Sequence, residues 1–164
     1  MSDAQTPAFH LRLRDGAAEE SMVLAGIWRR AWVAANPGAL MVEPIGHWLQ
    51  RVHAEFGPPA EVVLAERDGQ VLAFMVLLGR RDYVAQLFVE PHLRNQGLGQ
   101  ALLDEACVRM PAGWRLHVAL SNAPAQRFYE RYGLVRGEVD RHPASGRERV
   151  AYHWYPSRAP WRRG

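Results

Sequence analysis

Residues 87–100 read LFVEPHLRNQGLGQ, and this stretch decides the predicted fold. The apolar run that ends at Val89 predicts a strand, and the amphipathic pattern from Leu98 onward predicts a helix. The first amides of a helix have no partner inside it, and the helix dipole favours an anion beside them. A strand, a glycine-containing turn and a helix in this order therefore suggest a site for phosphate groups.

The turn itself has the residue types that a phosphate site needs. Gly97 and Gly99 have no Cβ to obstruct phosphate oxygens, and Arg94 adds a fixed positive charge. Two glycines this close together also occur in ordinary loops, so the pair alone does not decide the matter. No Gly-Lys-Ser/Thr follows, and the third glycine of the dinucleotide fingerprint is missing. These absences argue against both standard nucleotide-binding motifs.

The hydrophobic pattern outside this stretch predicts a single α/β domain over residues 1–164, with an ordered core over 8–156 and a tail over 157–164. Asp68-Gly69 is typical of a hairpin turn. The predicted order β-α-α-β-β-β-α-β-α-β-β gives a mixed, mostly antiparallel sheet flanked by helices. The strands are predicted at 9–14, 61–66, 71–78, 83–89, 114–120, 134–139 and 149–154, and the helices at 19–35, 44–56, 98–110 and 123–132.

Two motifs in this order resemble a known family. Arg94-x-x-Gly97-x-Gly99 after a strand is similar to the acetyl-CoA signature of the GNAT superfamily of N-acetyltransferases. The segment 116–134 is similar to the second GNAT motif, in which a strand leads to an Asn and then to a helix bearing a Tyr. Leu134 stands where the family usually has Phe. The resemblance covers residues 83–135, and the N-terminal half agrees only in its predicted order of elements.

The resemblance implies which residues bind the cofactor. In this family two central strands splay apart and the pantetheine arm pairs with the first of them, which corresponds here to Leu87, Phe88 and Val89. Asn122 would hydrogen-bond the cofactor arm, although Asn before Ala-Pro is equally typical of a helix N-cap. The pyrophosphate would be held by Arg94 and by the amides of Asn95, Gln96, Gly97, Leu98, Gly99 and Gln100.

Tyr129 is the predicted catalytic residue. An amine attacks the thioester directly, and the leaving thiolate of coenzyme A must be protonated. A phenol has a pKa near 10, above the ~8.5 of a thiol, so it keeps a proton to donate as general acid. The alternative is a core tyrosine on an amphipathic helix, beside Phe128 and Tyr132.

The general base is left open by the sequence. His117 lies on the strand before Asn122 and titrates in the useful range. Asp82 and Tyr83 lie near the place where some relatives have a Glu, and a water chain without a single base is a further alternative. For Glu90, beside Pro91, a structural role is the favoured interpretation.

Several other residue types are better explained by packing. Cys107, in an amphipathic helix, is interpreted as a small core residue rather than a nucleophile. Trp28, Trp32 and Trp48 suit either an aromatic acceptor pocket or the core, with the core favoured. The seven histidines show no metal-ligand spacing, so no metal is predicted.

Charge and composition limit the classes of molecule that the protein is expected to bind. All 20 residues counted as lysine or arginine are arginine. Residues 1–90 carry eight arginines and eleven acids, and residues 91–164 carry twelve and six, which gives net charges of −3 and +6. A basic half suits nucleic acid, a membrane surface or a small polyanion such as coenzyme A. Because the arginines are dispersed and no recognition signature appears, nucleic acid is not a predicted partner.

The expected location is the cytoplasm, with no membrane partner. The N-terminus lacks a basic start followed by an apolar run, and no stretch approaches the ~18 apolar residues of a membrane span. A single cysteine excludes an internal disulfide.

The expected function is acetyl transfer from acetyl-CoA, by direct attack in a ternary complex, to a primary amine of a small molecule or peptide. The alternative is a catalytically inactive GNAT-like module that binds acyl-CoA or regulates. The resemblance also leaves room for a homodimer through the C-terminal strands. Neither the acceptor nor the length of the acyl group follows from the sequence.

Overall fold

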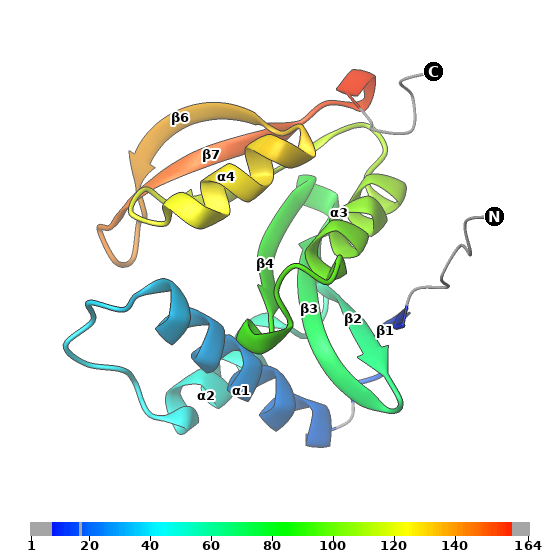
Figure 1. Cartoon of the computed structure of the whole chain (residues 1–164), viewed down its shortest axis with the longest axis vertical. Helices are drawn as coiled ribbons and strands as arrows, with labels where there is room; N and C mark the ends of the chain where they lie inside the picture. The colour runs from blue at the N-terminus through cyan, green and yellow to red at the C-terminus, as the bar shows by residue number, and fades with distance from the viewer. Residues whose placement is uncertain (1–7, 17, 159–164) are drawn as a thin grey trace. The chain divides into compact units, whose positions relative to one another are not determined.

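The computed structural model describes residues 8–16 and 18–158, and Figure 1 shows the arrangement of its elements. The helices are α1 (Ala18–Ala35), α2 (Ile45–Glu55), α3 (Leu98–Arg109) and α4 (Ala123–Tyr132), with short 3-10 helices η1 (Gly79–Arg81), η2 (Pro91–Leu93) and η3 (Pro156–Arg158). The strands are β1 (His10–Leu13), β2 (Glu61–Arg67), β3 (Gln70–Leu78), β4 (Tyr83–Val89), β5 (Trp114–Ala119), β6 (Val135–Arg141) and β7 (Glu148–Trp154).

The strands are hydrogen-bonded in the order β1-β2-β3-β4-β5-β7-β6. β4 and β5 pair in parallel, whereas β1–β2, β5–β7 and β6–β7 pair antiparallel. The predicted fold class and order of elements are therefore confirmed. The expected tail begins within η3, and the rest of it, residues 159–164, lies outside the described residues.

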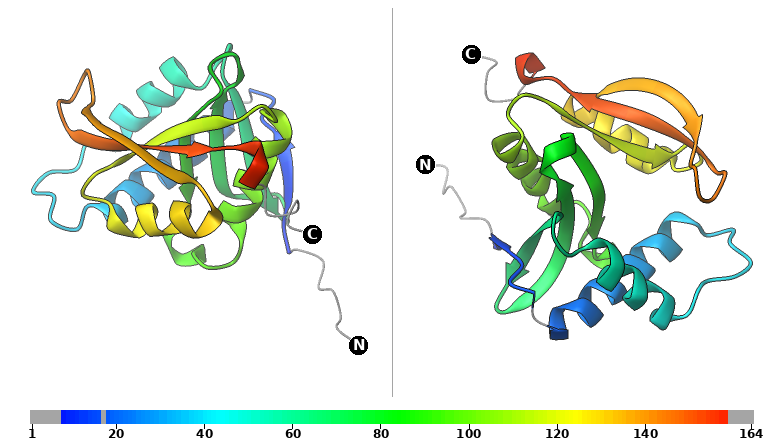
Figure 2. Two further views of the ribbon diagram at one scale, coloured as in Figure 1. Left: turned by 90° about the horizontal axis from the view of Figure 1, so that it is seen from above. Right: turned by 180° about the vertical axis from the view of Figure 1, so that it is seen from behind.

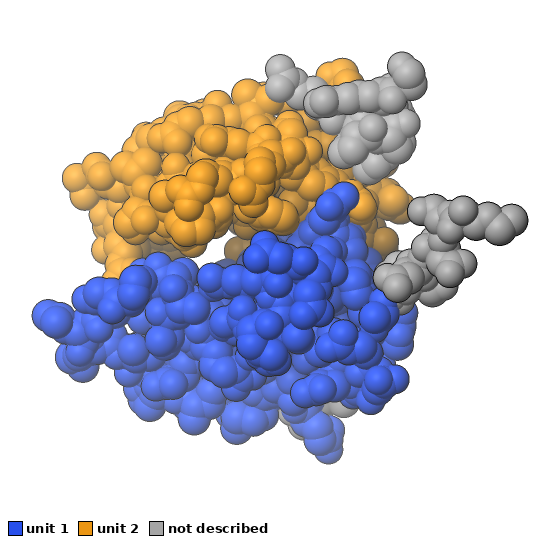
Figure 3. Space-filling model, viewed as in Figure 1, with its two compact units in different colours: residues 1–76, 86–102 blue, residues 77–85, 103–164 orange. Residues whose placement is uncertain are grey.

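Contacts along the chain group the described residues into two compact units, which Figure 3 colours separately. Unit 1 comprises residues up to 76 and residues 86–102, and unit 2 comprises residues 77–85 and the residues from 103 onward. β3, β4 and α3 each have residues in both units.

Unit 1 buries an apolar core between its strands and the pair α1 and α2, which lie side by side (Figures 1 and 2). β3 is buried along almost its whole length, as its uninterrupted apolar run predicts. The β2–β3 hairpin turns at Asp68 and Gly69, with φ of 51° and 76°. Both values are in the left-handed region that two-residue hairpin turns require, so the predicted turn is confirmed.

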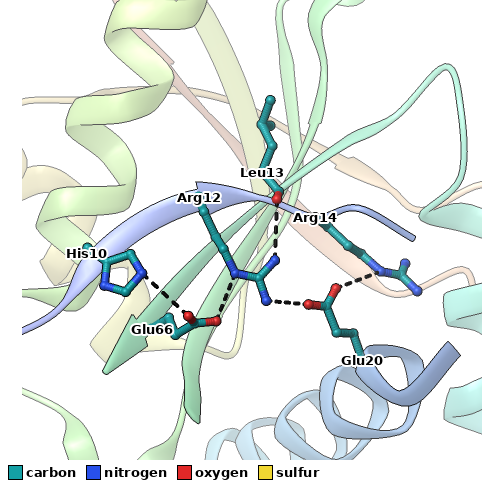
Figure 4. Close-up of polar contacts among 6 residues, drawn as sticks. All are labelled: His10, Arg12, Leu13, Arg14, Glu20 and Glu66. Atoms are coloured by element: carbon teal, nitrogen blue, oxygen red, sulfur yellow. Dashed lines mark hydrogen bonds and ion pairs between the residues drawn. The ribbon is translucent and has the colours of Figure 1, made fainter. Parts of the chain in front are cut away.

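A network of ion pairs ties β1 to β2 and α1 (Figure 4). Arg12 Nε donates to Glu66 Oε2 at 2.8 Å, and Arg12 also pairs with Glu20 at the start of α1. Arg14 Nη2 donates to Ser21 Oγ at 2.5 Å. The short first strand is therefore held by charged contacts as well as by its four ladder pairs with β2.

Unit 2 is a small sheet with two unlike faces, and α4 lies alongside it in every view (Figures 1 and 2). Along β5, Trp114 and Leu116 are buried, while Arg115 is exposed. The Tyr129 ring of α4 lies 6.0 Å from the ring of Tyr152, which pairs with Leu116. Because side chains alternate along a strand, the apolar face lies under α4 and the polar side chains project from the other face.

Candidate active site

The turn before α3 has a backbone that favours glycine. Asn95 has a φ of 65° and Gly97 a φ of 83°, both in the left-handed region. The Gly97 carbonyl accepts from the Ala101 N–H at 3.0 Å, so α3 begins directly after Gly97. Leu98, the first residue of α3, is buried, whereas Gln96 is exposed.

The amides of this turn are available to a ligand. Within the described part of the chain, no acceptor is present for the N–H groups of six consecutive residues, Asn95, Gln96, Gly97, Leu98, Gly99 and Gln100. Arg94 is exposed, and no carboxylate among residues 8–16 and 18–158 pairs with it. Unpaired amides, a helix N-terminus and an arginine together suit a pyrophosphate.

Glu90 anchors the start of the turn. Its carboxylate is nearly buried and accepts from Arg30 of α1 twice, at 2.6 and 2.8 Å. Its N–H donates to the Leu72 carbonyl and its own carbonyl accepts from the Leu93 N–H, both at 2.9 Å. The structural role predicted for Glu90 is therefore confirmed, although its partner Arg30 was not found from the sequence.

Leu87, Phe88 and Val89 form the last three residues of β4, all half-buried. The Phe88 ring lies 5.9 Å from the rings of both Trp28 and Phe74, so this side chain packs in the aromatic core of unit 1. The contacts of the three residues with pantetheine stay a prediction.

The tryptophans of α1 and α2 mostly belong to that core. Trp28 and Trp48 are 2% and 3% exposed, and their rings meet edge to face at 5.4 Å. Core packing, the favoured interpretation, is confirmed for these two residues. Trp32 is half-buried, with its ring 5.8 Å from that of Trp48.

Asn122 caps α4 in unit 2. Its Oδ1 accepts from the Ala125 N–H at 3.2 Å, and Pro124 lies in the first turn. Gly133 ends the helix at a φ of 113°, and its N–H donates to the Tyr129 and Glu130 carbonyls. The N-cap interpretation is confirmed. The predicted hydrogen bond from the Asn122 side chain to the cofactor arm stays a prediction.

Tyr129 is a buried phenol whose hydroxyl is free. The residue is 8% exposed, and burial raises the pKa of Tyr129 to about 12. Among the described residues, no side chain or backbone group hydrogen-bonds its hydroxyl. The hydroxyl oxygen is not among the fully buried polar atoms that lack a partner in the described residues, so it keeps some exposure and its donor is open to a ligand.

Tyr132, one turn further along α4, differs in this respect. Its hydroxyl donates to Asp104 Oδ1 at 2.5 Å and lies 3.6 Å from Cys107 Sγ. Burial raises the pKa of the Cys107 thiol, which keeps the sulfur protonated and unreactive. Cys107 is 2% exposed, so its interpretation as a core residue is confirmed.

His117 and Tyr83, two of the candidates for the base, are hydrogen-bonded to each other in unit 2. Tyr83 Oη lies 2.7 Å from His117 Nδ1. Asp82 is exposed at the C-cap of η1, and its carbonyl accepts from the Arg115 N–H. From the sequence, His117 and Tyr83 were separate candidates, and their pairing was not predicted. Only the register of β4 against β5 could have indicated it.

No group of three or more His, Cys, Asp or Glu residues that could hold a metal ion occurs in the part of the chain that the structure describes. None of the described helices is long and apolar enough to cross a membrane.

The order of elements and the glycine turn define an acetyltransferase of the GNAT type. The model of the acetyltransferase (GNAT) family matches residues 24–134, so the chain belongs to this family. It is an N-acetyltransferase that uses acetyl-CoA as acyl donor. The prediction of family, enzyme class and cofactor is confirmed.

Similar proteins agree with this assignment. The chain is 30% identical over 134 residues to the peptidyl-lysine N-acetyltransferase YjaB of Salmonella typhimurium, covering 79% of this chain and 89% of that protein. Two solved structures share the fold. Apo YjaB from Escherichia coli has a TM-score of 0.72 at 23% identity, covering 89% of this chain and 97% of that one. The PaiA N-acetyltransferase from Thermoplasma acidophilum, in complex with coenzyme A, has a TM-score of 0.67 at 18% identity, covering 88% and 99%.

Proposed function

We propose that this enzyme transfers the acetyl group of acetyl-CoA to the side-chain amine of a peptidyl lysine, by direct attack, with Tyr129 as general acid. The observation that carries the mechanism is the hydroxyl of Tyr129, which has no hydrogen-bond partner among the described residues although the residue as a whole is buried. A relative named as a peptidyl-lysine N-acetyltransferase supports the choice of acceptor.

The burial of Tyr129 suits a general acid that protonates the leaving thiolate. A phenol with a pKa of about 12 carries its proton at every physiological pH. A thiolate forming in a desolvated site is destabilised as well, which raises the pKa of the thiol toward that of the phenol. Tyr129 can therefore donate a hydrogen bond to the developing thiolate and then transfer the proton.

The turn of residues 94–100, the donor turn, supplies the groups that a pyrophosphate needs. Six amides without acceptors and the exposed Arg94 supply hydrogen-bond donors and positive charge for the pyrophosphate. Binding there contributes equally before and during reaction, so the turn sets acetyl-CoA affinity, whereas Tyr129 acts on turnover.

The test compares Tyr129→Phe with Tyr132→Phe, two variants that each remove one hydroxyl from α4. We expect Tyr129→Phe to lower kcat about a hundredfold, the low end for a general acid, without weakening acetyl-CoA binding. Tyr132→Phe leaves Asp104 without its donor, so it should lower stability by about 1–3 kcal/mol while kcat is retained. Turnover is followed as thiol release with a lysine peptide.

Product analysis is unambiguous because the chain contains no lysine. Acetyl-lysine found by mass spectrometry must come from the acceptor. Polyamines, amino acids and aminoglycosides, run alongside, show whether a small amine is preferred. Saturating acetyl-CoA at about 100 times Kd should add about 2.7 kcal/mol to stability. A thermal shift without turnover on any amine would favour the inactive module.

A further inference from the structure

We propose that Tyr83 and His117 form the general-base relay of this enzyme, in which Tyr83 takes a proton from the acceptor ammonium as its own hydroxyl proton passes to His117. This inference rests on the proposed acetyl transfer and assigns the step that removes the amine proton. The hydrogen bond between Tyr83 Oη and His117 Nδ1, at 2.7 Å, carries it.

The backbone of unit 2 holds the two rings together. Tyr83 is the first residue of β4 and pairs in parallel with Arg115 of β5, and the Arg115 N–H donates to the Asp82 carbonyl at 3.0 Å. His117 follows Arg115 by two residues and so projects from the same face. The ring centroids are 5.6 Å apart, and both side chains are half-buried, so solvent or an acceptor reaches them.

This face is the one opposite α4. Leu116, the neighbour of His117, is buried on the α4 side with Tyr152 and Tyr129. The proposed acid and the proposed base of unit 2 thus belong to opposite faces of one sheet. The proposed reaction therefore requires that the amine reaches Tyr83 from the face opposite α4 while the sulfur on the same carbon faces Tyr129.

Charged groups on three strands act on the imidazole. Arg149 of β7 and Arg115 of β5 favour its neutral form, while Asp140 and Glu138 of β6 favour the charged form. Burial is the largest effect and lowers the pKa of His117, so the ring is neutral at neutral pH. In the tautomer that accepts from Tyr83, Nδ1 carries the free lone pair.

The pKa of Tyr83 is shifted in the opposite direction. Burial raises the pKa of Tyr83, against a smaller lowering by Arg149 and Arg115. The phenol therefore keeps its proton in the resting enzyme and can donate a hydrogen bond to the imidazole. Arg149 is held in place by Asp140, through bonds of 2.7 and 3.2 Å.

The proton balance closes without a co-reactant. The acceptor ammonium loses two protons as its nitrogen bonds to the thioester carbon and the C–S bond breaks. The first passes to Tyr83 Oη while the Tyr83 proton moves to His117 Nδ1, and the imidazolium then releases it to water. The second passes to water, and Tyr129 regains from water the proton that it gave to the thiolate. The products are the amide, free coenzyme A thiol and one proton in solution.

The test is the pH profile of kcat/KM for a lysine peptide at saturating acetyl-CoA, in wild type, Tyr83→Phe and His117→Asn. Asn places an amide oxygen near the position of Nδ1, so it can still accept from Tyr83 but cannot take a proton. His153→Asn is the matched control, since His153 pairs with Arg115 across β5 and β7 and has no part in the relay.

The kcat/KM of wild type should be independent of pH from the lowered pKa of His117 up to the pKa of the amine, near 10.4. In both relay variants kcat/KM should be about a hundredfold lower than in wild type at pH 7. It should then rise about tenfold per pH unit, because the amine loses its proton to water instead. His153→Asn should follow wild type. Wild-type activity in both relay variants, or a loss that is equal at every pH, would overturn the relay.

Failure of the proposed function gives a different result. A wild-type enzyme that acetylates no amine removes the proposed function and the relay together. A wild-type enzyme that turns over, beside relay variants that match it, removes the relay alone. The thermal shift with acetyl-CoA should be the same in all four proteins, which confirms that each variant is folded.

Discussion

Replacing Arg30 by Met should destabilise the enzyme through the carboxylate it leaves behind. Arg30 of α1 holds Glu90 by two charge-assisted hydrogen bonds, at 2.6 and 2.8 Å. The side chain of Glu90 is only 11% exposed, whereas that of Arg30 is 55% exposed. The variant therefore leaves a nearly buried carboxylate without its cation at the point where β4 leads into the donor turn.

The loss of stability expected for Arg30→Met lies between two limits. An exposed ion pair contributes about 0–1 kcal/mol, and removing one partner of a fully buried pair costs about 3–5 kcal/mol. With one buried and one half-exposed partner, we expect a loss of about 2 kcal/mol, close to the value for hydrogen bonds to charged groups. For a domain of this size that lowers Tm by about 4–8 °C.

The assay is a double-mutant cycle in urea with Arg30→Met, Glu90→Gln and the double variant. The coupling energy should exceed about 1 kcal/mol, because the two residues share their bonds. Arg127→Met is the control, since Arg127 is an exposed arginine on α4 without a hydrogen-bond partner among the described residues. A loss below about 0.5 kcal/mol for Arg30→Met, or additive single effects, would refute the reasoning.

Three further variants test the site. Gly97→Ala meets no atom within 4 Å but must adopt a φ of +83°, so it should cost about 1–2 kcal/mol and raise the KM for acetyl-CoA. Asn122→Ala removes the N-cap of α4 and should cost about 1 kcal/mol of stability. The KM for acetyl-CoA should rise as well. A loss of stability without a change in KM would mean that Asn122 caps the helix and does not contact the cofactor. Tyr129 stays protonated to about pH 12 in the folded state while the unfolded phenol ionises near pH 10. The unfolding free energy of wild type should therefore fall more steeply between those values than that of Tyr129→Phe, as measured by urea unfolding.

Local patterns predicted the donor turn and α4 well. Gly97, Asn122 and Gly133 each act within a few residues of their own position, through a left-handed turn, an N-cap and a C-cap. The chemistry of such positions follows from residue type and spacing, so a single sequence reveals it.

Partnerships across the chain were not predictable in the same way. Arg30 and Glu90 are 60 residues apart, and Tyr83 and His117 are 34 apart. Each pair depends on which strands or helices pack together and in which register, and no local pattern encodes that. Tyr83 and His117 were therefore predicted only as separate candidates for the base, and their hydrogen bond was not predicted.

The register of the last strands explains how the polar face of unit 2 is built. On β6, the partners step from Arg136 opposite Tyr152 to Val139 opposite Val150, so β6 has one residue more than β7 across a bulge. The extra residue places Asp140 opposite Arg149; without it, Val139 would occupy that position. A Cβ at Gly137 would lie 2.8 Å from His153 Nε2, so the bulge favours glycine there. Because a slip of one residue exchanges the two faces of a strand, this bulge places Asp140 where it pairs with Arg149. Burial, and after it the charge of Arg149, lowers the pKa of His117.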